Sequence, residues 1–222
     1  MRLAEVESAA APPPQTAPGT AGDGVDPVTM PGSLQQPGRR IAVVGTSGSG
    51  KSHVARTLAR RLGLTYVCND TLIWRPHWTP TPRHERPALF DAALPADGGW
   101  TFDGNFSSMK DPEDHLILAR IDTLVWLDLP RWLAHTQLLG RTVRRAWTHE
   151  PLWHDNRESW RQSFASRDSI LLWALRSHAP LRRRYRALVA DTRAAHVRVI
   201  RLSSRSAVNR WLEAVSPSPR MC

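Results

Sequence analysis

The chain has 222 residues, a formal net charge of +10 and 41% hydrophobic residues, enough for one α/β domain with a sizeable core. Its only cysteines, Cys68 and Cys222, exclude a disulfide framework and a cysteine-based zinc site. No run of about 18 apolar residues occurs, so we expect no membrane span and a cytoplasmic protein.

Residues 1–38 are rich in Ala, Pro, Gly and Thr and show no apolar periodicity. We interpret them as a disordered extension or as residues that precede the true translation start, and a partner-binding tail is the alternative. A compact domain is predicted for residues 39–216, and residues 217–222 are expected to form a short tail.

Five apolar runs, each bounded by glycine, aspartate or serine, indicate buried strands of a parallel sheet. They span residues 41–44, 64–68, 100–102, 123–127 and 196–202. Helices are predicted between them, most clearly at residues 51–62, which end before Gly63, and at residues 131–147. The last helix follows a Ser203-Ser204 cap. This order predicts an α/β fold, a five-stranded parallel sheet with helices on both faces.

A glycine-rich segment joins the first strand to the first helix and matches G-x-x-x-x-G-K-[ST] at every fixed position. The segment is Gly45-Thr46-Ser47-Gly48-Ser49-Gly50-Lys51-Ser52. Its glycines let successive N–H groups curl around an anion at a helix N-terminus. Lys51 would reach the β- and γ-phosphates, and Ser52 would offer its hydroxyl to Mg²⁺. The motif therefore predicts a P-loop that binds ATP or GTP with magnesium.

The positive charge is concentrated in the second half of the chain. Residues 1–130 carry a net −2, residues 131–186 a net +8 and residues 187–222 a net +4. Arginine supplies all but two of the 30 basic residues. Such a cluster binds polyphosphate or nucleic acid, and charge alone does not choose between them.

The order of P-loop, Asp70, Asp103-Gly104 and an arginine-rich helix resembles the P-loop nucleotide and shikimate kinase group. The chain is most similar to adenylate-kinase-like proteins known as topology modulation (FlaR-like) proteins. The matching stretches are Asp70-Thr71-Leu72-Ile73-Trp74-Arg75-Pro76-His77-Trp78, Asp103-Gly104-Asn105-Phe106 and Leu127-Asp128-Leu129-Pro130-Arg131-Trp132. The resemblance implies a three-layer P-loop NTPase sandwich with a helical lid at about residues 141–175.

The resemblance also implies roles for three aspartates that follow predicted strands. Asp70 would orient or deprotonate the acceptor, although an Asx turn would also place an aspartate there. Asp103 would hold Mg²⁺ through water as the Walker-B carboxylate, and a simple turn is the alternative. Asp128 competes for the metal role, but the following Pro130-Arg131 favours a structural cap or a domain-closure contact.

Arg141 and Arg145 lie four residues apart on the predicted helix and so share a face. They match lid arginines of adenylate kinases and would bracket the transferring phosphate, the alternative being a solvated basic face. The arginines at 182, 183, 184 and 186 follow Pro180 at or before the start of another helix. One of them would complete the clamp, and the sequence does not say which.

The aromatic segment from Trp74 to Trp78 follows Asp70 and would stack on an acceptor, or else simply pack. Together these features predict an ATP-dependent kinase that transfers the γ-phosphate of Mg-ATP to a small acceptor, most specifically a nucleoside monophosphate. A P-loop ATPase or nucleotide-regulated nucleic-acid-binding protein is the alternative. The sequence gives neither the preference for ATP over GTP nor the oligomeric state.

Overall fold

The structure is a computed structural model that describes residues 35–106, 111–148, 153–156, 170–191 and 196–216. Its main sheet is parallel and has the strand order β2-β5-β1-β6-β7, which confirms the predicted fold class. The five strands are β1 (Arg40–Gly45), β2 (Thr65–Cys68), β5 (Trp100–Asp103), β6 (Thr123–Leu127) and β7 (Arg198–Leu202). Every predicted strand is present, with bounds shifted by two residues at most.

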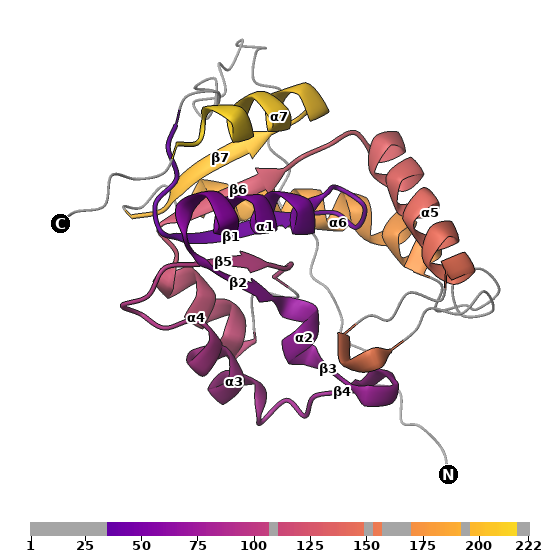
Figure 1. Ribbon diagram of the computed structural model, residues 1–222, viewed down its shortest axis with the longest axis horizontal. Helices are drawn as coiled ribbons and strands as arrows, with labels where there is room; N and C mark the ends of the chain where they lie inside the picture. The colour runs from indigo at the N-terminus through magenta and orange to yellow at the C-terminus, as the bar shows by residue number, and fades with distance from the viewer. Residues whose placement is uncertain (1–34, 107–110, 149–152, 157–169, 192–195, 217–222) are drawn as a thin grey trace, which may run out of the picture. The chain divides into compact units, whose positions relative to one another are not determined.

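Helices lie on both faces of this sheet (Figure 1). They are α1 (Lys51–Leu62), α2 (Asn69–Ile73), α3 (Arg86–Ala93), α4 (Pro112–Arg120), α5 (Arg131–Thr148), α6 (Ile170–Asp191) and α7 (Arg205–Ala214). A two-stranded hairpin of β3 (Trp74–Arg75) and β4 (Thr79–Pro80) follows α2. The sequence did not predict this hairpin, because strands of two residues are too short to show alternation.

Successive side chains of each strand point to opposite faces of the sheet, and each face packs against its own set of helices. Val125 and Leu127 of β6 belong to the buried cluster that includes Leu58 of α1 and Trp211 of α7. The Trp126 side chain points to the opposite face, where its ring lies 6.1 Å from the ring of Tyr185 on α6. On that face Phe102 of β5 likewise meets Phe90 of α3, at 6.2 Å.

Two capping residues that the sequence predicted are confirmed, one at the end of α1 and one at the start of α7. Gly63 ends α1 in a left-handed conformation, φ 63°, and its N–H donates to the Ala59 carbonyl. Ser204 begins α7, and its hydroxyl accepts the Ala207 N–H at 3.1 Å.

The prediction that a helix starts after Pro180 is wrong. This proline lies inside α6, which begins at Ile170. An internal proline removes one hydrogen bond of the helix. The buried side chains Leu181, Tyr185 and Leu188 hold this helix against the sheet and offset that loss. Among the described residues, none of the helices has the length and apolar content needed to cross a membrane.

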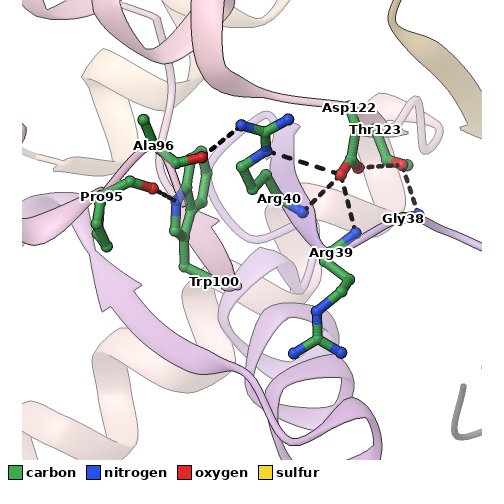
Figure 2. A network of polar contacts seen from close by, with 8 residues as sticks. All are labelled: Gly38, Arg39, Arg40, Pro95, Ala96, Trp100, Asp122 and Thr123. Atoms are coloured by element: carbon green, nitrogen blue, oxygen red, sulfur yellow. Dashed lines mark hydrogen bonds and ion pairs between the residues drawn. The ribbon is translucent and has the colours of Figure 1, made fainter. Parts of the chain in front are cut away.

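At the opposite end of the strands from the P-loop, Asp122 fixes where β1 begins (Figure 2). Its Oδ2 accepts the N–H groups of Arg39 and Arg40, each at 2.9 Å. The Thr123 hydroxyl donates to Asp122 Oδ1 at 2.8 Å and accepts the Gly38 N–H at 2.9 Å. These bonds set the register of β1 against β6, and through it the position of the loop that follows β1.

We expect Asp122→Ala to lower the free energy of unfolding by about 1.5–3 kcal/mol, because two backbone donors lose a charged acceptor. Urea denaturation measures this change. Asp97→Ala, at an exposed position of the same end of the sheet, is the control and should change stability by less than about 0.5 kcal/mol. Equal losses in the two variants would contradict the role given to Asp122.

Candidate active site

The P-loop follows β1 and packs directly against α5. Gly48 has φ 82°, and a Cβ added there would lie 2.1 Å from the Ala134 carbonyl oxygen and 2.9 Å from Leu138 Cβ. Gly50 has φ 90° with open space around it, so its conformation alone requires glycine. Two constraints therefore require glycine in this loop: the close approach of a helix and a left-handed backbone conformation.

The Lys51 side chain bonds back to the start of the P-loop. Its ammonium donates to the carbonyl oxygens of Gly45 and Thr46, each at 3.0 Å. Burial lowers the pKa of Lys51 below its ordinary value, and the nearby carboxylates Asp103 and Asp70 oppose that shift. The ammonium thus stands in a partly desolvated position between the loop and two acids, as a phosphate-binding lysine requires.

Asn105 anchors the start of the loop. Its Oδ1 accepts the Gly45 N–H at 3.2 Å and the Tyr185 hydroxyl at 2.8 Å. The Gln137 amide of α5, oriented to suit its neighbours, donates to the Gly48 carbonyl at 2.9 Å and accepts from Arg205 Nε at 3.1 Å. The sequence did not predict these contacts; for Gln137, the signal was its spacing of four before Arg141.

Asp103 lies at the carboxyl end of β5, directly opposite Val43 of β1 and Cys68 of β2. It is buried, and its Oδ2 accepts the Tyr66 hydroxyl at 2.8 Å. Burial and the charge of Asp103 raise the pKa of Tyr66, so the tyrosine stays a proton donor. The structure thus places the predicted Walker-B carboxylate beside the P-loop.

Asp70 lies in the first turn of α2, next to the end of β2. Burial and the negative charge of Asp103 raise its pKa, while Lys51, Arg141 and Arg145 pull that pKa down. The carboxyl therefore lies within electrostatic reach of all three of these predicted cationic groups. The structure brings the predicted acceptor-positioning acid and the predicted phosphate clamp to one place.

A cavity of about 430 Å³ lies over the P-loop, between α1 and α5. Its lining includes five basic side chains: Lys51, Arg56, Arg60, Arg141 and Arg144. Of the predicted clamp, Arg141 lines this cavity, and Arg141 and Arg145 both lower the pKa of Asp70. Arg144, three residues after Arg141, faces the cavity and was not predicted to do so.

Asp128 is held by two arginines and is therefore a structural residue, as the sequence favoured. Arg182 contacts both carboxylate oxygens, at 2.6 and 3.1 Å, and Arg201 Nη2 donates to Oδ2 at 2.6 Å. Arg201 also lies over the Trp126 ring, 4.9 Å from its centroid. Because Arg182 binds this buried carboxylate, its guanidinium is engaged away from the predicted phosphate clamp.

The aromatic segment after Asp70 packs against a distant part of the chain. Trp78 contacts Trp74 at 5.9 Å and Trp153 at 6.5 Å between ring centroids. The buried Asn156 amide binds the same hairpin, accepting the Trp78 N–H at 2.9 Å and donating to the Arg75 carbonyl at 3.0 Å. A role for these rings in stacking on an acceptor stays a prediction. Arg157, Arg161 and Arg167, which fall in the predicted lid at about residues 141–175, lie outside the described residues.

The oxygen donors here suit the magnesium ion that a P-loop implies. Ser52 is the second residue of α1, and hydroxyl and carboxylate oxygens are ligands that Mg²⁺ accepts alongside phosphates and water. The negative charge of Asp103 contributes to the raised pKa of Asp70. A cation bound near these two acids would therefore stabilise their charged forms. The residues therefore fit the ion.

Three comparisons with known proteins were made. No protein-family model matches the chain, and no curated protein matches it. Among solved structures, a gluconokinase from Sinorhizobium meliloti has 16% identity and a TM-score of 0.46, covering 81% of this chain and 93% of its own. A shikimate kinase from Acinetobacter baumannii, in complex with shikimate, has 18% identity and a TM-score of 0.45, covering 80% and 90%.

A sugar kinase from Janibacter has 18% identity and a TM-score of 0.42, covering 80% of this chain and 91% of its own. These three proteins are described as kinases. The FlaR-like resemblance of this chain stays a prediction. The fold assignment rests on the strand order of the sheet and on the P-loop motif.

We expect Asp70→Asn to stabilise the unliganded protein at neutral pH. Asp70 has a raised pKa in the folded state, so above its ordinary pKa of 3.8 the native state binds more protons than the unfolded state. Stability then falls as pH rises through the window between the two pKa values. Urea denaturation should show a gain at neutral pH that disappears as pH falls toward 3.8. Glu213→Gln, at an exposed position, is the control, and a gain independent of pH would contradict this account.

Proposed function

We propose that the protein is an ATP-dependent kinase that transfers the γ-phosphate of Mg-ATP to a small acceptor. The observation that supports this most is the electrostatic convergence of Lys51, Asp70 and Arg141 beside the P-loop. A loop that only binds nucleotide needs the lysine and the amides. A carboxyl for the acceptor and arginines for the transferring group are what phosphoryl transfer adds.

The proposed mechanism relies on positioning and charge. P-loop amides and Lys51 hold the β- and γ-phosphates, and Arg141 with Arg145 stabilises negative charge on the transferring group. Ser52 and Asp103 would hold magnesium, which neutralises phosphate charge when bound. Asp70 orients the acceptor and, if that acceptor is a hydroxyl, accepts its proton.

For the acceptor we propose a nucleoside monophosphate, on the basis of the sequence resemblance. Such an acceptor already carries a nucleophilic phosphate oxygen, so it needs positioning and no strong base. An alcohol of a sugar or a hydroxy acid would depend much more on Asp70.

The alternative, a P-loop ATPase that acts on nucleic acid, is less well supported. It draws on the net +8 of residues 131–186. In the structure two of these arginines bond to other parts of the protein, Arg182 to Asp128 and Arg184 to the Phe106 carbonyl. A third, Arg141, lines the cavity above the P-loop. Salt-dependent DNA binding tighter than non-specific binding would favour this alternative.

The proposal is tested by a coupled ATP-consumption screen against nucleoside monophosphates, nucleosides, and small sugar and acid acceptors. We expect one class to stimulate turnover, and Lys51→Ala to abolish that turnover while the circular dichroism spectrum and melting temperature stay close to wild type. Unchanged turnover in Lys51→Ala would reject the donor site. Stimulation by DNA alone would support the alternative.

If the two arginines clamp the transferring phosphate, their removal should lower turnover more than it lowers the affinity for ATP. Replacing both Arg141 and Arg145 by alanine should lower kcat by about 10²-fold or more, because their charge matters most in the transition state. The affinity for ATP, measured by calorimetry, should fall by much less. Arg210→Ala, on α7, is an exposed control. Equal losses in kcat and ATP affinity would show that the pair acts in ground-state binding only.

A further inference from the structure

Tyr66 contacts the Asp103 carboxylate from the neighbouring strand. Cys68 of β2 lies opposite Asp103 of β5, so Tyr66, two residues earlier, projects on the same face of the sheet. From there its hydroxyl reaches Asp103 Oδ2 at 2.8 Å. This distance is ordinary for an O–H···O hydrogen bond. The bond fixes one oxygen of the carboxylate and leaves Oδ1 for another partner.

The Tyr66 ring is itself held by the wall of the cavity. The Arg56 guanidinium lies over this ring, 5.0 Å from its centroid, and Arg56 also lines the cavity above the P-loop. A cation over a tyrosine ring is attracted to its face and restricts its motion. The chain of contacts therefore runs from the cavity through Arg56 and Tyr66 to Asp103.

Fixing Asp103 matters because Lys51 is close enough to compete for it. The Asp103 charge is the largest influence raising the pKa of Lys51. A carboxylate free to rotate would turn both oxygens toward that ammonium and draw it from the phosphates. A neutral hydroxyl donor holds the carboxylate without adding a second cation.

We propose that Tyr66 is a positioning residue that holds Asp103 in the orientation in which its carboxylate would bind the magnesium of a nucleotide. The inference rests on the proposed function. Outer partners of this kind typically change metal affinity by roughly 10- to 100-fold when they are removed. Tyr66 would thus act on the metal-dependent part of nucleotide binding and leave the metal-independent part unchanged.

Tyr185 provides a matched control, since it is the other tyrosine of the chain and its hydroxyl also donates to a site residue. Its bond, also 2.8 Å, goes to Asn105, which accepts the Gly45 N–H of the loop. Tyr185→Phe should therefore weaken nucleotide binding with and without magnesium alike, because it loosens the P-loop amides. Tyr66→Phe should weaken binding in magnesium only.

The experiment is calorimetric titration of the full chain with adenosine 5′-(β,γ-imido)triphosphate, in EDTA and in excess Mg²⁺. The readout is the ratio of the two Kd values. We expect Tyr66→Phe to reduce the magnesium enhancement by roughly 10-fold or more and to leave Kd in EDTA unchanged. In Tyr185→Phe both Kd values should rise by the same factor, with the ratio preserved.

The outcomes separate the two proposals. If the wild type binds no nucleotide in either buffer, the proposed function fails. If the wild type shows a magnesium enhancement that Tyr66→Phe retains in full, the role of Tyr66 is overturned. Should Tyr66→Phe fail to fold, Asp103→Asn and Tyr66→Phe/Asp103→Asn give the same comparison without a buried carboxylate. Equal ratios in that pair are expected, and a further loss on adding Tyr66→Phe would overturn the inference.

Discussion

The close approach between the P-loop and α5 is the constraint on which the site depends. At Gly48 there is no room for a Cβ, because the carbonyl of Ala134 and the side chain of Leu138 occupy that space. The contact fixes the loop against the helix that carries Arg141 and Arg144. The amides and the arginines consequently face one cavity, and a substitution at this glycine would disturb both at once.

The same cleft concentrates charges that are unfavourable in the absence of a ligand. Burial lowers the pKa of Lys51 and raises that of Asp70, so each group is held where its charged form is disfavoured. Such paired shifts are common at catalytic sites and follow from burying ionisable groups away from water. By contrast, Asp128 has two arginine partners and belongs to the frame of the sheet.

The sequence predicted the sheet and the P-loop because both depend on local signals. Apolar runs mark each strand, and the motif glycines lie between β1 and α1, where the structure has them. It did not predict Tyr66, Asn105 or Arg144 at the site. Their roles depend on contacts across the fold, such as Tyr66 with Asp103, which are 37 residues apart. The spacing of arginines showed that α5 has a basic face, but only the packing of α5 on the P-loop chose Arg141 and Arg144 for the cavity.

We propose that the amides from Gly45 to Ser52, with Lys51, form a binding site for the polyphosphate of a nucleotide. Calorimetry of the wild type with Mg-ATP, followed by competition with inorganic tripolyphosphate, tests it most directly. The account predicts saturable binding at one site per chain, with tripolyphosphate displacing the nucleotide. No measurable association at millimolar Mg-ATP would contradict it.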